Sequence, residues 1–557
     1  MKKQLFSLLF TFCFIYSSYS QNWDWANGAG GNQKVEAYSI AIDDAGNSYI
    51  TGSFEATLNF GSVTLTASVA GNIYASDVFI AKYNSLGALV WAQKAGSTSY
   101  DYGNGIATDA AGNVYVTGLF MGTATFGSLT VTSSADYDIF IAKYDSSGNA
   151  LWVKKAGGSG WDVGSGVSID NTGNCYITGS YRNTGTFGGT TLTSAGSYDA
   201  YVAKLDNAGT FLWAKSLGGI SDDRGISVST DQSNNCYMTG YFIGTLTSGT
   251  TTITSAGGSD MYMAKFDASG NPVWAKRAGS DMNDEGTSIT TDVAGNLYVT
   301  GYFKDTAVFD SITVITSGAE DIFVGKFDYK GDVIWLKKYG GTQNDRGYGI
   351  SLDSSSNIYV AGAFFGTGQF DTITAVSYNQ DDAFIAGINN LGKTKWVKSG
   401  GGINADIGRS VAASAYGSCY TTGYYSGSAE FGTNTISGVS DNDLFVAKLD
   451  STFIIAMPDN TGIDGNMINA KNITVYPNPS KSDITILLET ANNIQLRVEL
   501  YDVLGKIVTD KAVISETKNS FSKKQISINR GSLPDGIYFG KVIAGDQVYT
   551  TRLMLIK

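Results

Sequence analysis

The 557-residue chain contains 69 glycines, 5 prolines, 12% aromatic and 16% charged residues, a composition that excludes disorder for most of the length and favours short strands joined by tight turns. It has no histidine, which excludes Ser-His-Asp and Cys-His catalysis, the usual zinc sites and imidazole pH switching. The net charge is −12 and residues 471–557 are net basic, so residues 4–470 form an acidic body and we expect no nucleic-acid partner.

Residues 1–20 have the pattern of a secretory signal peptide. Lys2 and Lys3 precede the apolar run from Leu5 to Tyr16, and small residues follow it. The run is shorter than the roughly 20 residues that a membrane-spanning helix needs. We expect cleavage between Ser20 and Gln21 and no transmembrane segment in the mature chain.

A 61-residue repeat fills most of the chain. Six tryptophans recur at this interval, and an aspartate and a glycine, the glycine in a Thr-Gly pair in six copies and after Ala361 at Gly362, recur seven times at nearly the same spacing. The first Thr-Gly interval is longer than the rest, so the first copy carries five extra residues between Ala67 and Ala75. Such a period is the signature of a repeat architecture. The repeated residues are Trp91, Trp152, Trp213, Trp274, Trp335 and Trp396, with Asp77, Asp138, Asp199, Asp260, Asp321, Asp382 and Asp443.

One copy of the repeat contains four predicted strands. These are residues 225–230, which alternate polar and apolar side chains, then 236–242, 260–266 and the tryptophan strand 272–276. A segment rich in glycine, threonine and serine between the second and third strands predicts an extra hairpin. Four strands per repeat, stacked radially in seven copies, predict an all-β fold, a seven-bladed β-propeller.

The repeats are out of phase with the strand count. A lone fourth strand, Trp23–Ala26, opens the array, and the array closes at Asp443–Lys448, a third strand with no tryptophan strand behind it. We expect the N-terminal strand to supply the missing fourth strand of the last blade. The ring formed by residues 21–450 would then have no open edge.

These segments resemble the SBBP family of β-propeller repeats. The motif residues are the run Gly112–Gly118, the run Asp138–Asp145, and the pair Leu151 and Trp152. The resemblance extends over the repeats of residues 21–450. It implies an extracellular bacterial propeller and no defined activity.

Three cysteines lie beyond the signal, and each directly precedes a tyrosine. Other copies of the repeat have serine, valine, leucine or isoleucine at this position, so cysteine serves there as a small buried side chain. We expect neither a disulfide nor a metal site at Cys175, Cys236 and Cys419.

The end of the chain forms a separate predicted domain. Residues 451–470 lose the repeat and are predicted to be a linker. Residues 471–557 are predicted to form a small Ig-like β-sandwich. Its expected strands are 483–488, 496–501, 525–528, 537–542 and 548–556.

This tail resembles the type A C-terminal sorting domain of the type IX secretion system. The matching positions are Pro477, Asn478, Pro479, Gly505, Gly536, Tyr538 and Lys557. The resemblance implies that the type IX machinery carries the chain through the outer membrane and that the domain is removed. It also implies a protein that is released or anchored at the outer surface of a Gram-negative bacterium.

Six aspartates at the start of the first strands are the candidates for a cation site. Six carboxylates on equivalent loops could crowd one rim of the channel and bind Ca²⁺, and no other cofactor is expected. The favoured alternative is that each carboxylate accepts hydrogen bonds from the backbone of its own loop. The six are Asp101, Asp162, Asp223, Asp284, Asp345 and Asp406, and Val35 takes this place in the first copy.

Other repeated charges are predicted to be scaffold. The seven third-strand aspartates recur too regularly for a single site, and a lysine row beside these aspartate rows predicts repeated ion pairs. The Asp-x-x-Gly turns lack the alternating carboxylates and distal glutamate of a calcium loop. The lysine row is Lys82, Lys143, Lys204, Lys265, Lys326 and Lys448.

A function on a symmetric scaffold should show as broken symmetry. We expect a monomeric binding or adhesion module for a glycan or a surface protein, and no catalytic residues are singled out. Two alternatives stay open: a polysaccharide-degrading enzyme with paired carboxylates, and a structural surface protein. The residues that break the repeat are Trp161, Arg182, Arg224, Glu285, Lys304, Arg346, Arg409 and the segment 72–74.

Overall fold

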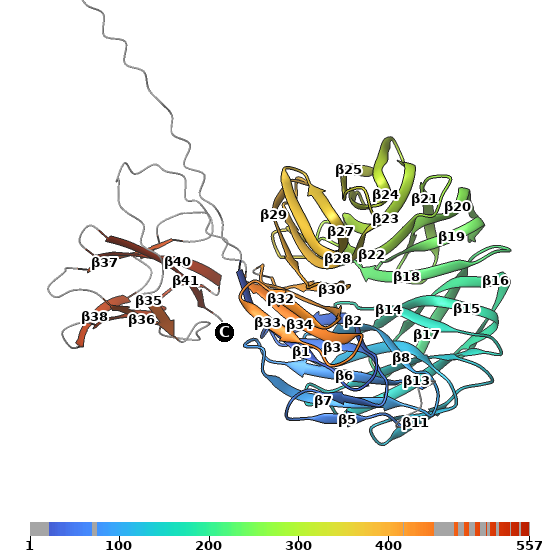
Figure 1. Cartoon of the computed structure of the whole chain (residues 1–557), viewed down its shortest axis with the longest axis horizontal. Coiled ribbons are helices and arrows are strands. Elements are labelled where there is room, and N and C mark those ends of the chain that lie inside the picture. The colour runs from blue at the N-terminus through green and yellow to red at the C-terminus, as the bar shows by residue number, and fades with distance from the viewer. Residues whose placement is uncertain are drawn as a thin grey trace, which may run out of the picture. The chain divides into compact units, whose positions relative to one another are not determined.

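Two compact units make up the chain, Met1–Phe453 and Ile454–Lys557 (Figure 1). The computed structural model describes residues 22–69, 75–415, 417–450, 473–476, 484–489, 496–501, 508–509, 513–519, 523–534, 536–544 and 547–555. Every secondary-structure element within these ranges is a β-strand, so the predicted all-β class is confirmed. The predicted cleavage site, Ser20 and Gln21, and the segment 72–74 lie outside the described residues.

The larger unit is built from four-stranded antiparallel meanders. In one of them, β18 (Asp223–Thr230), β19 (Cys236–Ser248), β20 (Thr251–Phe266) and β21 (Pro272–Gly279) pair in chain order. The predicted extra hairpin is present, but it is continuous with the second and third strands and does not form separate elements. The register of β19 and β20 shifts where Gly244 adopts φ +74°, and the pairing then continues outward.

The same meander recurs along the chain. Each copy has its first three strands in chain order and its fourth strand paired to the third. The copies are β2 (Val35–Ile42), β3 (Ser48–Phe54), β6 (Asp77–Tyr83) and β7 (Leu89–Gly96); β8 (Tyr102–Thr108), β9 (Val114–Phe120), β12 (Asp138–Tyr144) and β13 (Ala150–Gly158); β14 (Val163–Ile169), β15 (Cys175–Phe187), β16 (Thr190–Leu205) and β17 (Phe211–Leu217); β22 (Glu285–Thr291), β23 (Leu297–Phe309), β24 (Ile312–Phe327) and β25 (Val333–Tyr339); β26 (Asp345–Leu352), β27 (Ile358–Phe370), β28 (Ile373–Ile388) and β29 (Thr394–Gly400); and β30 (Ile407–Ala413), β31 (Cys419–Tyr425), β34 (Asp443–Asp450) and β1 (Asn22–Ala29).

In three copies the hairpin forms short strands of its own. These are β4 (Thr57–Asn59) with β5 (Thr64–Thr66), β10 (Thr123–Phe126) with β11 (Leu129–Thr132), and β32 (Ser428–Phe431) with β33 (Asn434–Ser437).

The N-terminal strand completes the last meander. β1 pairs antiparallel with β34, with Ala26 opposite Ala447, and Lys448 Nζ lies 2.9 Å from Asp24 Oδ2. We call β2, β8, β14, β18, β22, β26 and β30 the inner strands. They contact one another in this order, and β30 contacts β2 again.

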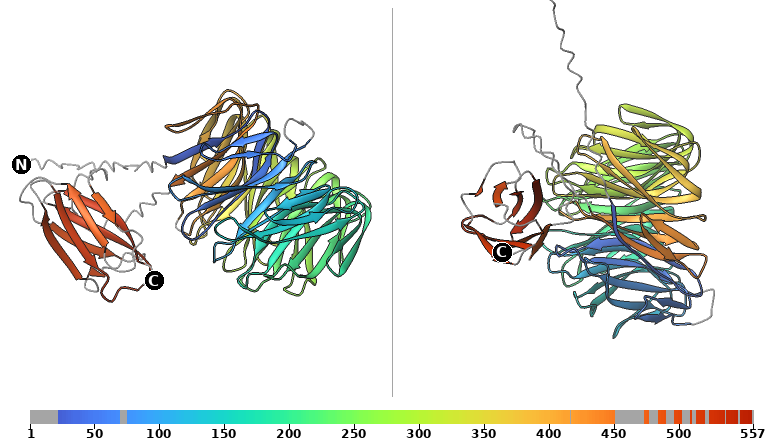
Figure 2. Two further views of the ribbon diagram at one scale, coloured as in Figure 1. Left: turned by 90° about the horizontal axis from the view of Figure 1, so that it is seen from below. Right: turned by 60° about the vertical axis from the view of Figure 1, so that its left-hand side comes forward.

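The hydrophobic core lies between the sheets, which are stacked face to face (Figure 2). One core cluster combines Tyr176 and Val202 of one meander with Met238 and Tyr262 of the next. Third strands are buried on both faces because a sheet covers each side; every residue of β12 is buried. The three cysteines are buried and free, and burial raises the pKa of each thiol, as expected for cysteine used as a small apolar side chain.

The glycine of each Thr-Gly pair is required by close backbone packing. A Cβ on Gly240 would lie 1.9 Å from the carbonyl oxygen of Arg224 in the neighbouring inner strand. That inner strand carries a β-bulge at this level, between Gly225 and Ser227. The corresponding distance at the other six glycines is 1.7–2.1 Å: Gly52, Gly118, Gly179, Gly301, Gly362 and Gly423.

We expect Gly240→Ala to destabilise the larger unit by at least about 2 kcal/mol, because backbone must move to admit the methyl group. The matched control is Gly189→Ala, since no atom lies within 4 Å of the Cβ position there. Urea unfolding of both variants measures the effect. Equal midpoints for Gly240→Ala and the unaltered chain would contradict the packing argument.

The smaller unit contains two antiparallel sheets. One has the order β35 (Ile473–Tyr476), β36 (Ile484–Glu489), β39 (Lys523–Asn529), β38 (Val513–Asn519), and the other β37 (Leu496–Tyr501), β40 (Gly536–Ala544), β41 (Gln547–Leu555). The sequence did not predict β35 and β38. Ile526 and Ile528 of the first sheet share a core with Leu500, Val542 and Leu553 of the second.

Few of the predicted sorting residues fall in the described part of the smaller unit. Tyr538 is buried and its hydroxyl donates a hydrogen bond to the Pro534 carbonyl, 2.9 Å away. Gly536 begins β40. Pro477, Asn478, Pro479, Gly505 and Lys557 lie outside the described residues.

Candidate binding site

The six candidate calcium aspartates are buried and bind backbone N–H groups. In Asp162, Oδ2 accepts from Gly158 N at 2.7 Å and Oδ1 accepts from Arg182 N at 2.9 Å. Gly158 ends the preceding meander and Arg182 lies in the second strand of the new one, so the carboxylate joins the two. Asp101, Asp223, Asp284, Asp345 and Asp406 also accept from the residue four positions earlier, and all of these except Asp223 also accept from the second strand of the new meander or the residue after it.

These contacts correspond to the local alternative that the sequence favoured over a calcium ring. Within the described residues, no three aspartate, glutamate or cysteine side chains come together as metal ligands. Each of the six carboxylates accepts a backbone N–H group of its own loop.

Each of these aspartates faces a third-strand aspartate of the preceding meander. A Cβ on Gly157 would lie 2.6 Å from Asp162 Oδ2 and 2.7 Å from Asp138 Oδ1. The pKa of Asp101 is raised to about 8 and that of Asp162 to about 7. Burial is the largest cause, and the charge of the neighbouring carboxylate adds to it. Asp138 Oδ1 is buried without a hydrogen-bond partner among the described residues.

The raised pKa values predict that the protein is more stable in mild acid. An unfolded aspartate has a pKa of about 3.9, so the folded state binds extra protons between pH 4 and 8. The protonated aspartates contribute fully to the free energy of unfolding below about pH 4. This contribution is lost as the pH rises through 6 to 8, because Asp284, Asp345 and Asp223 have pKa values of about 6, 7 and 8.

Denaturant unfolding from pH 4 to 9 tests this dependence. We expect the midpoint to fall as the pH rises from 5 to 8.5, and Asp162→Asn and Asp345→Asn to flatten the slope. A midpoint that stays level or rises over this range would be inconsistent with raised pKa values at Asp162 and Asp345.

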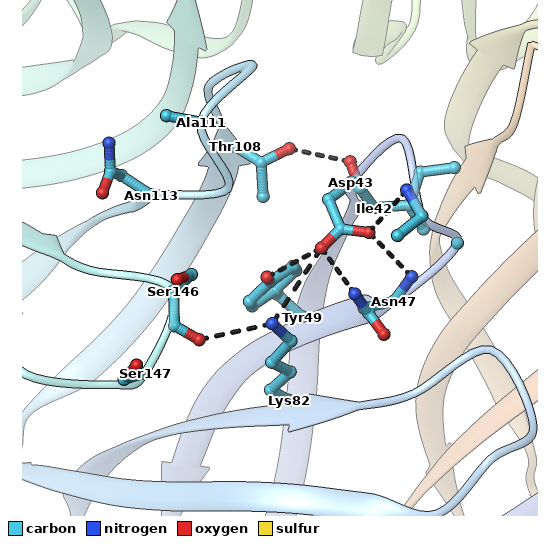
Figure 3. Close-up of polar contacts among 12 residues, drawn as sticks. Ile42, Asp43, Asn47, Tyr49, Lys82, Thr108, Ala111, Asn113, Ser146 and Ser147 are labelled. Carbon is cyan, nitrogen blue, oxygen red and sulfur yellow. Dashed lines mark hydrogen bonds and ion pairs between the residues drawn. The ribbon is translucent and has the colours of Figure 1, made fainter. Parts of the chain in front are cut away.

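The lysine row forms ion pairs, but with the turn aspartates and not with the third-strand row. Lys82 Nζ lies 4.0 Å from Asp43 Oδ2 and donates to the Ser146 carbonyl of the next meander at 3.3 Å (Figure 3). Asp43 also accepts from the Tyr49 hydroxyl at 3.0 Å. The same pairs recur as Lys143 with Asp109, Lys204 with Asp170, and Lys326 with Asp292.

Third-strand aspartates take different partners. Lys94, Lys155 and Lys338 lie within 3.0–3.3 Å of Asp77, Asp138 and Asp321, and Arg277 lies 3.0 Å from Asp260. Each partner lies on the fourth strand of the same meander as its aspartate. Both aspartate rows therefore belong to the scaffold.

A hollow of about 520 Å³ lies where three inner strands end. It is lined by the ends of β2, β8 and β14 and by the turns that follow, including Asp43, Asp109 and Asp170. We call this side of the larger unit the trailing end, and the side where the inner strands begin the leading end. The turn aspartates already accept backbone N–H groups, for example Asp43 from Asn47 N, so the hollow presents few free acceptors.

The leading end is where the repeat is broken. We compare the residue that directly follows the buried aspartate, or that follows Val35 in the first copy. This residue is charged in four meanders and is tyrosine, valine or isoleucine in the other three. Arg224 faces Tyr241 across the strand pair, and Glu285 faces Tyr302. The set is Glu36, Tyr102, Val163, Arg224, Glu285, Arg346 and Ile407.

These side chains form a connected series of polar and aromatic contacts. Glu285 Oε2 accepts from the Tyr302 hydroxyl at 2.6 Å, and Arg346 Cζ lies 4.9 Å from the centroid of the Tyr302 ring. Arg346 Nε donates to Glu320 Oε2 at 2.5 Å. The pKa of Glu285 is raised, and burial is the largest cause. Arg224 Cζ lies 4.3 Å from the centroid of the Tyr198 ring.

An aromatic pair is exposed at the same end. Trp161 stacks on Tyr137 with ring centroids 4.8 Å apart, and 46% of Trp161 is exposed. Trp161 directly precedes the buried Asp162, which holds its loop. Tyr100 and Tyr102 form a second stacked pair, with centroids 6.2 Å apart.

Sequence reasoning found the arginines and Glu285 of this site and missed Glu36, Glu320 and the tyrosines. Arg224, Glu285, Arg346 and Arg409 were singled out as repeat-breaking, and they all lie at the leading end. Lys304 is exposed and makes no described ion pair. The signal that was available is a tyrosine directly after the Thr-Gly pair, as in Tyr241, Tyr302 and Tyr424.

Comparison with known families agrees with both resemblances. Residues 474–557 match the family described as secretion system C-terminal sorting domain, and residues 28–53, 90–119 and 334–363 match the β-propeller repeat SBBP. The chain carries SBBP β-propeller repeats and a C-terminal sorting domain. The sorting domain marks the chain for secretion and implies contact with the secretion machinery. The described ranges contain no helix that is long and apolar enough to cross a bilayer.

Two curated proteins are similar to the chain. An uncharacterized WD repeat-containing protein, L264, of Acanthamoeba polyphaga mimivirus is 24% identical over 473 residues, which cover 65% of this chain and 33% of that protein. The regulatory protein FlaEY of Caulobacter vibrioides is 25% identical over 316 residues, 52% of this chain and 32% of that protein. The chain spans about a third of the length of both relatives.

Among solved structures, a member of the DUF4221 family from Bacteroides vulgatus aligns with a TM-score of 0.27 and 9% identity. The alignment covers 61% of this chain and 92% of that chain.

Proposed function

We propose that the chain is an extracellular binding protein. Its larger unit is a closed seven-bladed β-propeller that binds a glycan or protein ligand at the leading end. Its smaller unit is an Ig-like β-sandwich that directs the chain to the type IX secretion system. The cycle of inner-strand contacts and the pairing of β1 with β34 support the closed ring.

The observation that carries the proposal is the contrast between a repeated scaffold and an irregular leading end. The buried aspartates, the Thr-Gly pairs and the lysine ion pairs recur from meander to meander. The residues that directly follow the aspartates include arginine, glutamate, tyrosine and isoleucine. Stability needs no such variety at equivalent positions, whereas recognition of an asymmetric ligand does.

The proposed route of export uses both ends of the chain. A signal peptide of residues 1–20 would be cleaved between Ser20 and Gln21, and the sorting domain, residues 471–557, would be removed after outer-membrane passage. Residues 451–470 then serve as a linker. The remaining propeller, residues 21–450, would act as a monomer on the outer surface of a Gram-negative bacterium or after release.

An enzyme that degrades polysaccharide is the second candidate. Glu285 supports it, because a buried carboxyl with a raised pKa suits a general acid. Its Oε2, however, accepts from the Tyr302 hydroxyl, and the carboxylate whose charge acts on it, Glu320, is already paired with Arg346. A purely structural surface role predicts assembly without ligand and conflicts with a monomer.

Binding can be located with one aromatic substitution. We expect Trp161→Ala to weaken binding about tenfold, because exposed aromatic faces supply contact area at low entropic cost. The purified full chain is screened against glycans and peptides, scored for both binding and cleavage, and its best ligand is titrated calorimetrically.

The control for this titration is Leu151→Ala. Leu151 is 50% exposed, much as Trp161 is, but it lies on the outer strand β13. Equal losses in the two variants would count against the leading end, and cleavage of a polysaccharide would favour the enzyme.

Removal of residues 471–557 should abolish appearance of the propeller at the cell surface and in the medium. The shortened chain is expected to accumulate in the periplasm, because it keeps its signal peptide and loses its sorting domain. Cell fractionation and surface proteolysis measure the outcome. As a converse control, residues 471–557 fused to an unrelated exported protein should carry it to the surface. A shortened chain that still reached the surface would refute the sorting role.

A further inference from the structure

Arginine is distributed unevenly in the larger unit. Residues 22–450 contain five arginines, and four of them lie at the leading end with Cζ 4.3–5.8 Å from a tyrosine ring centroid. The fifth, Arg277, pairs with Asp260. Most scaffold ion pairs use lysine instead. Arginine differs from lysine in its planar fork, which binds carboxylates bidentately while its face stacks on an aromatic ring. The four are Arg182, Arg224, Arg346 and Arg409.

Arg409 has the most enclosed setting of the inner-strand arginines. Its Cζ lies 4.8 Å from the ring centroid of Tyr348 on the neighbouring inner strand and 5.4 Å from that of Tyr424 in its own meander. Nη2 lies 3.5 Å from the Tyr424 hydroxyl. The guanidinium is thus held between two aromatic rings at the junction of two meanders.

This cation has no anionic partner in the described part of the chain. Arg346 pairs with Glu320 and Arg224 lies 3.9 Å from Asp222. No carboxylate oxygen of the described residues forms an ion pair with Arg409, and its Nε is buried without a hydrogen-bond partner. Buried charges in proteins are normally paired, because an unpaired charge in a poorly solvated site costs free energy.

Glu36 is the acid whose charge acts on Arg409, and its oxygens are already occupied. Oε2 accepts from the Tyr38 hydroxyl at 2.6 Å and lies 3.0 Å from Lys34 Nζ, and Oε1 accepts from Asn442 Nδ2 at 2.7 Å. The Glu36 oxygens are therefore engaged by Lys34, Tyr38 and Asn442, and neither forms an ion pair with Arg409. An anion in direct contact with Arg409 would come from outside the described chain.

We propose that the guanidinium of Arg409, held between Tyr348 and Tyr424, binds the carboxylate of an acidic sugar residue in a polysaccharide. The inference rests on the proposed function and narrows its ligand class. A guanidinium stacked on rings keeps its edge N–H groups in one plane, and a planar carboxylate accepts two of them side by side.

Two features of the leading end favour a polysaccharide over a single small anion. Arg224, Arg346 and Arg409 lie on β18, β26 and β30, the first two beside Asp222 and Glu320, so an extended ligand at Arg409 would meet polar side chains of several meanders. The Trp161–Tyr137 pair offers an exposed aromatic face, and the C–H groups of a sugar ring pack well on the electron-rich face of an aromatic ring.

The test compares polygalacturonate with its methyl ester on the purified full chain, by calorimetric titration. The two polymers share one backbone and differ in carboxylate charge. We expect polygalacturonate to bind at least about tenfold more tightly than the ester, and its affinity to fall as salt is raised. This comparison uses the unaltered chain and does not depend on the folding of any variant.

Substitution then assigns the site. We expect Arg409→Gln to weaken polygalacturonate binding about ten- to a hundredfold, because it removes charge-assisted hydrogen bonds, and Arg409→Lys to restore part of the loss. The control Lys395→Gln removes the same charge from an exposed position on the outer strand β29 and should change nothing. Thermal unfolding of each variant verifies its fold.

Several outcomes would overturn the inference. These are equal binding of both polymers, binding of dextran sulfate but not polygalacturonate, and equal losses for Arg409→Gln and Lys395→Gln. In each case, capture of a neutral glycan or peptide through Trp161 would leave the proposed function standing. Absence of any ligand in the whole screen would count against both.

Discussion

In six of the seven meanders, a buried aspartate at or directly before the start of the inner strand holds the loop that leads into that strand. Asp162 accepts N–H groups from Gly158 of one meander and Arg182 of the next, so a single carboxylate joins two sheets and holds the loop between them. The residue that follows is thereby presented at the leading end from a rigid support. Variation among the meanders gathers at that residue and its neighbours, since replacing Asp162 would remove its hydrogen bonds to two sheets.

Repetition made most of the fold predictable. A 61-residue period shows which positions are equivalent, so the strand order, the offset of the first strand and the buried cysteines follow from the sequence. It does not show which equivalent rows face each other. The lysine row was assigned to the aspartate rows as a whole, but Lys82 reaches Asp43 and Ser146, residues of different meanders. In the tail, which has no repeat, β35 was missed because it is only four residues long and runs directly into Pro477, and β38 because only its first two residues are apolar.

The leading end was partly predictable for the same reason. Departures from the repeat identified Arg224, Glu285, Arg346 and Arg409. The residues that contact these side chains, however, lie on neighbouring strands. Tyr348 belongs to the inner strand before that of Arg409, and Tyr424 to the strand after it. Only the folded arrangement shows that Glu36 is already paired and that Arg409 is not. Charge type is readable from sequence, whereas charge balance at a site is a property of three-dimensional packing.

The pairing of β1 with β34 makes the whole propeller depend on its two most distant strands. Asn22 lies opposite Asp450, so the last sheet cannot be completed until the final strand of the array has been delivered. Until then both strands expose unpaired backbone groups, which invite pairing with other chains. Contacts of such long range also slow folding. A chain that loses one meander would therefore leave the first strand without a correctly placed partner. Such an incomplete product would expose an open sheet edge.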